Sequence, residues 1–326
     1  MEWNATGRSA GRDLRRYRHV RAFGTLPIMS DTTAAESSEA VAEQVPQPRL
    51  VVGIDGSDDS AAALRWAVAM AEETASEVTP VCAWHVPLPI FALAGRRAID
   101  VDRMGLQATA EVTASATIAT VDAPGRVAEL VAIEGHPTDV MLDQTGSDTV
   151  VVVGRRGISE FRHRVLGSVS RDLATHGEGP VVVVPVHWEP RPCRKIVVGF
   201  DGSDHSQAAL RWALHIAPEP AVVTVLMAID VIPWLQPELV VERHPDYVES
   251  AEVRIRAALD EVDPDARAER LVVLHGARQA LAEAMGDADL IVLGPRGMGG
   301  VGRALLGSVT TWMLHSATCP VAVVPS

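Results

Sequence analysis

Two short loops, each occurring twice in this chain of 326 residues, carry residue types that could bind an anion. One loop reads Gly-x-Asp-Gly-Ser and follows an apolar run. The other reads Gly-x-x-Gly, then nine further residues, then Gly-Ser. Glycine lacks a Cβ atom, so its backbone can adopt positive φ and its N–H group can approach an anion closely. A helix that begins at Gly-Ser adds free amides and the positive end of the helix dipole. The loops therefore favour phosphate binding.

The loop residues are Gly53, Asp55, Gly56, Ser57, Gly154, Gly157, Gly167 and Ser168 in the first copy, and Gly199, Asp201, Gly202, Ser203, Gly294, Gly297, Gly307 and Ser308 in the second. A helix dipole contributes about 0.3–1 kcal/mol, whereas micromolar binding needs about 8 kcal/mol. Several amides, the serine hydroxyl and a base pocket must therefore act together, and an acid such as Asp55 is suited to accept hydrogen bonds from ribose hydroxyls. The simpler interpretation is a turn followed by a helix cap. The repeated spacing of nine, around unrelated residues, favours a loop that closes around a ligand.

An internal duplication organises the rest of the chain. Residues 51–67 and 197–213 differ at only three of seventeen paired positions, and later segments match in the same order. Such self-similarity must be recognised before the fold is assigned. We expect two domains, 49–187 and 195–326, joined by a proline-containing link at 188–194.

Apolar runs alternate with amphipathic stretches in each half. Leu64, Ala67, Val68 and Ala71 recur at helical spacing after a turn that Ser57 or Asp58 can cap. A longer helical stripe runs over 248–262, and helices begin at Ser168 and Ser308. The runs predicted as strands are 50–54, 78–86, 126–133, 150–153 and 181–184 in the first half, with 271–274, 290–293 and 321–324 in the second.

These patterns predict an α/β fold of two tandem, Rossmann-like domains, each with a doubly wound five-stranded parallel sheet. The fourth and fifth strands are apolar throughout, as expected where helices cover both sheet faces. Ligands of such sheets bind at the carboxyl ends of the strands. The two loops meet there only if the first and fourth strands are neighbours.

Composition excludes several classes of protein. With 47% hydrophobic and 22% charged residues the chain is not a disordered or fibrous protein. A net charge of −13 argues against nucleic acid as a partner, and no apolar run has the 18 residues that a membrane helix needs. The three cysteines, at positions 82, 193 and 319, are expected to be unpaired thiols in the cytoplasm. We find no metal-binding spacing, no Gly-Lys-Ser/Thr phosphate loop and no catalytic base shared by both halves.

The first 48 residues differ from the rest. Residues 1–28 are rich in arginine, residues 31–44 are small, polar and acidic, and neither stretch shows helical or strand periodicity. We expect this tail to be disordered. Met29 begins Met-Ser-Asp-Thr-Thr, which resembles a natural start, and one hypothesis is that residues 1–28 are over-annotated upstream translation.

Over residues 49–326 the chain resembles the universal stress protein family in its tandem, two-domain, ATP-binding form. The nucleotide signature of that family is Gly-x-x-Gly, nine residues and Gly-Ser/Thr, and both halves match it in full. The resemblance implies that ATP, with Mg²⁺, binds between the loops after the first and fourth strands. It also implies that the two halves pair through their last strands as an intrachain pseudo-dimer. Homodimerisation and a protein partner stay open.

The resemblance implies roles for particular residues. Asp55 and Asp201 would hold the ribose, and the backbone at Val86 and Ala228 would meet the adenine. The residues implied at the phosphates are Gly154, Gly157, Gly167, Ser168, Gly294, Gly297, Gly307 and Ser308, while Gly53 and Gly199 begin the first loops.

The two halves also differ at this motif. In the first half the resemblance leaves Arg155, Arg156 and Arg164 within reach of phosphate. In the second half Pro295 deletes one amide donor. This difference predicts weaker binding at the second site.

The function that the sequence predicts is an ATP-binding, nucleotide-dependent regulator of the stress response rather than a metabolic enzyme. Turnover needs a positioned base and charge stabilisation, so any hydrolysis should be slow. Three alternatives stay open: a slow ATPase switch, a scaffold that binds no nucleotide, and an adenylating enzyme, which the Gly-x-Asp-Gly-Ser-Asp run faintly resembles.

Overall fold

The computed structural model describes residues 20–21, 48–86, 103–121, 125–157, 166–230, 245–263, 267–299 and 305–326. The elements of the first half are β2 (Arg49–Gly53), α1 (Asp58–Thr74), β3 (Val78–Trp84), α2 (Arg103–Ile118), β4 (Val131–Glu134), α3 (Pro137–Leu142), β5 (Thr149–Gly154), α4 (Ser168–His176) and β6 (Val181–Val184). Those of the second half are β7 (Lys195–Gly199), α5 (Asp204–Ile216), β8 (Val222–Ala228), α7 (Pro245–Val262), β9 (Ala268–Val273), α8 (Ala277–Ala284), β10 (Leu290–Leu293), α9 (Ser308–Ser316) and β11 (Val321–Val323). Strands and helices thus alternate as expected.

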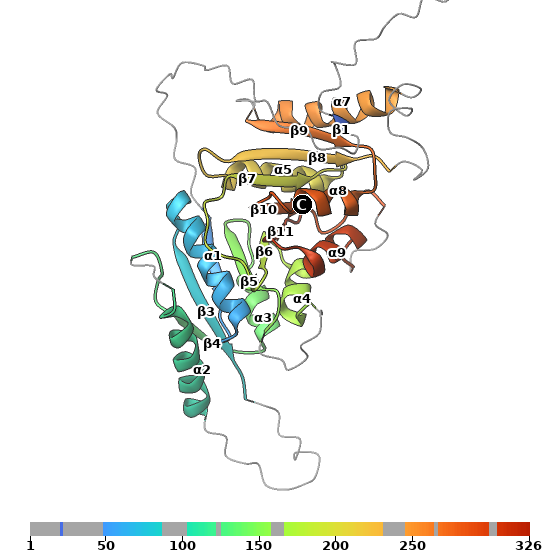
Figure 1. Ribbon diagram of the computed structural model, residues 1–326. Helices are drawn as coiled ribbons and strands as arrows, with labels where there is room; N and C mark the ends of the chain where they lie inside the picture. The colour runs from blue at the N-terminus through green and yellow to red at the C-terminus, as the bar shows by residue number, and fades with distance from the viewer. Residues whose placement is uncertain are drawn as a thin grey trace, which may run out of the picture.

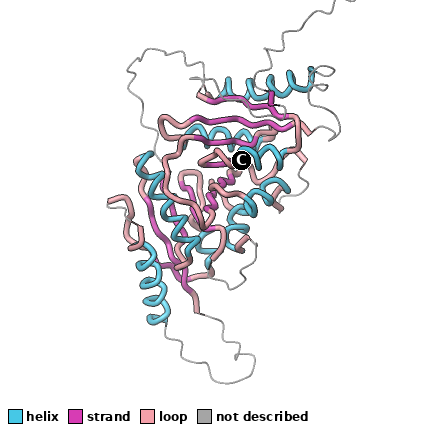
Figure 2. Tube along the Cα trace, in the orientation of Figure 1, coloured by secondary structure: helices cyan, strands magenta, loops and turns pink. Residues whose placement is uncertain are grey.

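The strands form one continuous sheet in the order β1-β9-β8-β7-β10-β11-β6-β5-β2-β3-β4. Within each half the named pairs are parallel, and the strand order reverses between the first and fourth strands, which are β2 and β5 or β7 and β10. Each half is therefore the doubly wound α/β domain that the sequence predicts. Figure 1 shows the first half in blue to green and the second in yellow to red, and Figure 2 shows helices on both sides of the strands.

The halves join through their last strands. β6 and β11 pair antiparallel, with Val183 opposite Val321 and Val182 opposite Ala322. This contact confirms the pairing that the family resemblance implies. It also removes two apolar edges that would otherwise be open to pairing with other chains.

Two residues of the N-terminal tail form a strand. β1 (Val20–Arg21) pairs in parallel with β9, next to Val272 and Val273. The expectation of disorder over residues 1–48 is wrong at these two positions. Without β1, β9 would end the sheet, and the free backbone groups of such an edge accept an added segment.

The third strand of the first half is shorter than predicted. β4 begins at Val131 rather than at residue 126, and Val127 makes only an isolated bridge to Val78. Between this bridge and the pair Val81–Val131 there are three residue steps on β3 and four on its partner, so one extra residue interrupts the ladder as in a β-bulge. Pro80 of β3 lies within this interval and has no N–H to donate.

One buried cluster extends through both halves on one face of the sheet. It includes Leu50 and Trp66 of the first half and Ile196 and Ile216 of the second. Alternate residues of the central strands, such as Val151, point into a second cluster on the opposite face, so the apolar central strands are covered on both sides. Trp66 is buried in the cluster that both halves share.

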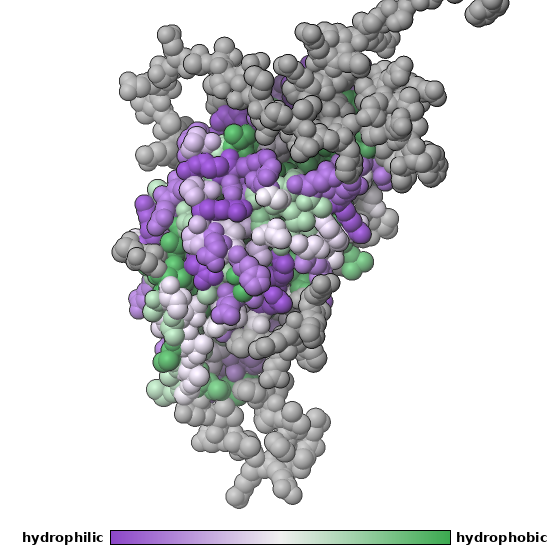
Figure 3. All heavy atoms as spheres, viewed as in Figure 1, coloured by the Kyte–Doolittle hydropathy of each residue, from purple (hydrophilic) through white to green (hydrophobic). Residues whose placement is uncertain are grey.

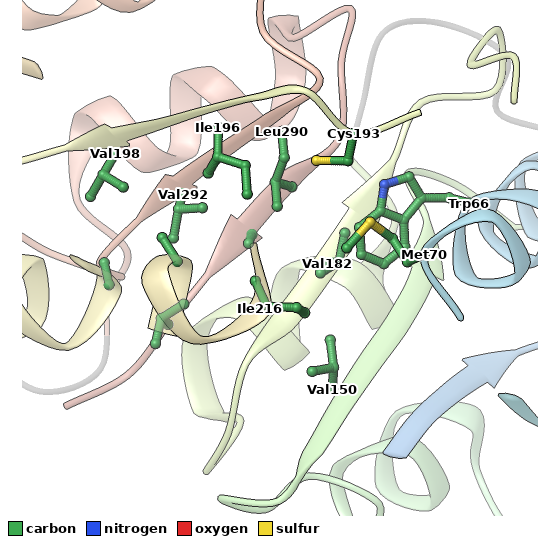
Figure 4. Packing of buried hydrophobic residues seen from close by; sticks show 14 of the residues in the cluster. Trp66, Met70, Val150, Val182, Cys193, Ile196, Val198, Ile216, Leu290 and Val292 are labelled. Atoms are coloured by element: carbon green, nitrogen blue, oxygen red, sulfur yellow. The ribbon is translucent and has the colours of Figure 1, made fainter. Parts of the chain in front are cut away.

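The link between the halves, residues 188–194, is anchored by two buried residues, and its other residues are exposed. Cys193 and Trp188 are buried in the shared cluster, and Figure 4 shows Cys193 beside Trp66 and Met70 of α1. Glu73 of α1 accepts a hydrogen bond from the Cys193 amide at 2.8 Å. Trp188 and Cys193 therefore fix the link to the core that the halves share.

The described residues add three further observations. Cys82, Cys193 and Cys319 are free and buried, and burial raises the pKa of Cys193 to about 12. No helix in this part of the chain has the length and apolar character to span a bilayer. On the face drawn in Figure 3, hydrophilic residues cover most of the middle of the molecule.

The shared sheet predicts that a charge at its centre destabilises both halves together. Val182 is fully buried, so Val182→Asp should lower the free energy of unfolding by at least about 3 kcal/mol. Val131→Asp is a matched control, because Val131 is 41% exposed on β4 and should lose no more than about 1 kcal/mol. Urea unfolding followed by tryptophan fluorescence measures the stability of both variants. If Val182→Asp and Val131→Asp lose the same free energy of unfolding, this account of the contact is contradicted.

Candidate functional site

The loops that carry the two motifs meet at one edge of the sheet in each half. β2 pairs with β5, and β7 pairs with β10. The loop that follows the first strand therefore lies beside the loop that follows the fourth strand. The condition that the sequence analysis left open is met.

The first loop is a tight turn built on its aspartate. The Asp55 carboxylate accepts hydrogen bonds from the Ser57 amide at 3.0 Å and the Ser57 hydroxyl at 2.6 Å. Gly56 has a φ of +87°, which requires glycine in practice. Ser57 then accepts from the amide of Ser60 and caps α1, as predicted.

In the second half the aspartate also reaches the neighbouring loop. Oδ1 of Asp201 accepts from the amide and hydroxyl of Ser203, and Oδ2 accepts from the amide of Met298 at 2.9 Å. A Cβ atom on Gly297 would overlap this same Oδ2. Glycine is needed here because the carboxylate packs against the backbone, a role that the sequence analysis did not assign to it.

The first half repeats the close approach. A Cβ atom on Gly157 would lie only 2.5 Å from Oδ2 of Asp55. The second glycine of Gly-x-x-Gly thus makes room for an aspartate in both halves.

The first glycine of Gly-x-x-Gly makes room for a helix. A Cβ atom on Gly154 would lie 2.6 Å from Cβ of Asp59, and one on Gly294 would lie 2.6 Å from Cβ of His205. Asp59 and His205 are in the first turns of α1 and α5. These glycines therefore let the ends of β5 and β10 approach the helices that follow the first strands.

The Gly-Ser pairs are tied back to the start of their own loops. The Gly167 amide donates to the carbonyl of Arg155 at 2.9 Å, and the Gly307 amide donates to the carbonyl of Pro295 at 2.7 Å. Gly167 and Gly307 occupy the N-cap positions of α4 and α9 and supply no side-chain cap. The first amides of each helix are thus left for other acceptors, next to the ends of β5 and β10.

The remaining glycines serve packing. A Cβ atom on Gly53 would press on Met141 and Val153, and one on Gly199 would overlap Leu293. Both glycines thus permit close contact with the neighbouring strand or helix. Their predicted place at the start of the first loop agrees with the ends of β2 and β7.

The two positions predicted at the adenine are not equivalent. The registers pair Gly53 with Val81 and Gly199 with Leu226, so the counterpart of Ala228 is Ala83. Ala228 is the last residue of β8, whereas Val86 lies two residues beyond the end of β3. Val86 and Ala228 both remain near the carboxyl edge, but only one of them belongs to a strand.

The arginines of the first half make different contacts. The guanidinium of Arg155 donates to the carbonyl oxygens of His315 and Ala317, at the end of α9 in the other half. The expectation that Arg155 adds a cation to the first site is therefore wrong, because the helix end and its dipole hold this side chain. Nε of Arg156 lies 3.8 Å from Oδ1 of Asp59. Arg164 lies outside the described residues.

Two aspartates of these loops have shifted pKa values. Burial raises the pKa of Asp59, an effect that the positive charge of Arg156 partly offsets. Burial also acts to raise the pKa of Asp201, but hydrogen bonds from Ser203 and Met298 outweigh it and lower that pKa. Asp201 is therefore ionised at neutral pH and holds the two loops together as a carboxylate.

Asp59, His205 and Arg254 also lie at these loops, although the sequence did not single them out. The first two occupy one of the three positions that differ between residues 51–67 and 197–213, so a signal for them was present. Arg254 of α7 donates to the carbonyl oxygen of Asp201 at 3.1 Å. The alternation of apolar residues along α7 says nothing about this contact.

The lowered pKa of Asp201 predicts a pH-dependent contribution to stability. A depressed carboxyl pKa stabilises the fold above its unfolded-state value of about 3.9, and the contribution is lost as the pH falls through the folded-state value. Asp201→Asn should therefore cost about 1 kcal/mol at pH 7, with a smaller difference from the natural protein at pH 3. Urea unfolding at both pH values measures this, with the exposed Asp260→Asn as control. A difference that stays constant would contradict the role of the charge.

Comparisons with known proteins agree with the repeated fold. The model of the universal stress protein family matches residues 48–185 and again 192–325. A universal stress protein of Mycolicibacterium smegmatis is 30% identical over 292 residues, covering 84% of this chain and 96% of the relative. Universal stress protein Rv2623 of Mycobacterium tuberculosis is 31% identical over 296 residues, covering 84% and 95%.

Solved structures show the same architecture. The crystal structure of a universal stress protein from Archaeoglobus fulgidus has a TM-score of 0.59 at 16% identity and covers 85% of this chain and 98% of its own. At that identity the likeness concerns the fold alone. Taken with the two family matches, the chain belongs to the universal stress protein family and contains the family's domain twice in tandem.

Proposed function

We propose that each half of this protein binds one adenine nucleotide, ATP, and that the bound nucleotide regulates the protein's role in a stress response. The observation that carries the proposal is the closure of both glycine loops. The Gly167 amide meets the Arg155 carbonyl and the Gly307 amide meets the Pro295 carbonyl. The open first turn of a helix thus lies beside the carboxyl ends of the central strands twice in one chain, and such a position favours phosphate.

The phosphate chain would bind along the backbone of both loops. In each half the glycine amide of the Gly-Ser pair is used in closing the loop. The serine that follows it, Ser168 or Ser308, would supply its backbone amide and its hydroxyl to phosphate. Gly154, Gly157, Gly294 and Gly297 let this backbone pack against the aspartates and the first turns of α1 and α5, which sets the position of each loop. Bound ATP would supply a triphosphate whose charge the helix dipole favours.

Asp55 and Asp201 would both order their loops and bind the ribose. A carboxylate can accept about four hydrogen bonds, and Asp201 accepts hydrogen bonds from Ser203 and Met298. We propose that the Asp201 carboxylate also accepts a hydrogen bond from a ribose hydroxyl, and that Asp55 does so in the first half. The adenine would lie toward the ends of β3 and β8, near Val86 and Ala228.

We propose that Mg²⁺ accompanies ATP and is held mainly by phosphate oxygens. In the part of the chain that the structure describes, no group of three or more His, Cys, Asp or Glu side chains is arranged to hold a metal ion. A regulatory rather than a metabolic role and a cytoplasmic location are further parts of the proposal that come from the sequence.

The proposal predicts that ATP stabilises the natural protein and not a variant with both loops altered. At 100 times its dissociation constant, ATP with Mg²⁺ should raise the free energy of unfolding by about 2.7 kcal/mol per site. The double variant Gly157→Ala, Gly297→Ala should lose most of this gain, because each new Cβ meets an aspartate oxygen. Thermal unfolding with and without ATP measures the effect.

A matched control separates loop damage from a general effect of glycine replacement. Gly286→Ala adds a Cβ atom whose nearest neighbour is 3.8 Å away, so this variant should keep the full response to ATP. If the natural protein shows no shift at millimolar ATP, the proposed function is wrong. If ATP still stabilises the double variant as strongly as the natural protein, ATP binds somewhere other than the glycine loops.

A further inference from the structure

The two candidate sites differ in the residue that the helix after the second strand presents to them. A Cβ atom on Gly202 would lie 2.6 Å from Nη2 of Arg254 in α7. A Cβ atom on Gly56 would overlap the side chain of Thr113 in α2. Arg254 and Thr113 are therefore counterparts over the same turn, and only the second half has a cation there.

The Arg254 guanidinium spans both loops of the second site. Its Nη2 donates to the Asp201 carbonyl at 3.1 Å and lies 3.2 Å from Sδ of Met298, the residue that follows Gly297. Arg254 is exposed, and within the described residues its contacts use only Nη2. The other donors of the guanidinium fork are available to a ligand, and such a fork matches phosphate oxygens well.

A second difference also makes the first site less favourable for an anion than the second. The first turn of α1 presents Asp59, a buried acid, beside Gly154, while the first turn of α5 presents His205 beside Gly294. The carboxylate of Asp59 accepts a hydrogen bond from the Arg156 amide at 3.2 Å, so one backbone donor of the first loop is already occupied. The second half has no acid at this position.

The remaining charges near the two loops do not cancel this difference in charge between the halves. Arg155 of the first half is opposed by Pro295 in the second, but its guanidinium is bound to carbonyl oxygens of α9. Arg156 and Arg296 are counterparts, and by sequence residues 158–166 and 298–306 each have a formal charge of +1 with histidine neutral. The surroundings of the second Gly-x-x-Gly loop are therefore more positive than those of the first.

We propose that Arg254 is a phosphate-binding residue of the second site and makes that site the one with the stronger preference for a triphosphate. This inference rests on the proposed function. It reverses the order of affinities predicted from Pro295, because the Pro295 carbonyl still closes its loop through Gly307 and Arg254 adds a charge that the first half lacks. The preference depends on charge, so it should weaken with salt.

The experiment uses the full chain with the first site altered by Gly157→Ala, so that calorimetry reports the second site. ATP and AMP are titrated separately in the presence of Mg²⁺. Arg254→Gln should weaken ATP binding about fivefold, the effect of an exposed charge contact, and change AMP binding less than twofold. Arg254→Lys should lose less of the preference for ATP than Arg254→Gln, because lysine retains the charge but lacks the planar fork. Arg256→Gln, an exposed arginine on the same helix, is the control and should change neither.

The outcomes separate the inference from the proposed function. If neither nucleotide binds to the natural protein, the proposed function fails. If ATP binds and Arg254→Gln weakens ATP and AMP equally, Arg254 only positions the loop and the inference is overturned. An unchanged ATP affinity in Arg254→Gln, or a loss in Arg254→Lys as large as that in Arg254→Gln, would overturn it as well.

Discussion

The structure depends on a carboxylate that joins two loops distant in sequence. Asp201 orders its own turn through Ser203 and holds the Met298 amide, 97 residues away. Burial of that charge is unfavourable, and the three hydrogen bonds offset it. A side chain on Gly297 would prevent the contact. The Gly-x-x-Gly motif is therefore first a condition for joining the loops and only then a surface of free amides for a ligand.

The second organising contact is the pairing of β6 with β11, which makes one sheet and one shared core out of two similar halves. The repeat is not perfectly symmetric. Arg155 links the first glycine loop to the end of α9, the helix whose start belongs to the second site, and Pro295 makes no such link back. The two halves therefore share their architecture but differ in charge and in contacts around their loops.

Much of this was predictable from the sequence, because the relevant signals are local or repeated. The duplication, the apolar runs and the Ser57 cap each depend on a few neighbouring residues. What could not be predicted depends on contacts across the fold. These are the contact of Arg155 with the end of α9, the position of Arg254 over Asp201, and the different positions of Val86 and Ala228 relative to the ends of their strands. The bulge after Val127 and the short helices α3 and α8 also lack a strong periodic signal, since only one or two turns are involved.

The central claim is that the pair of loops in each half binds one adenine nucleotide. Native mass spectrometry of the intact chain titrated with ATP tests this claim most directly. The account predicts species that contain one and then two nucleotides per chain. A chain that takes up no ATP at millimolar concentration, or a single nucleotide that persists unchanged when Gly157 and Gly297 are both replaced by alanine, would contradict it.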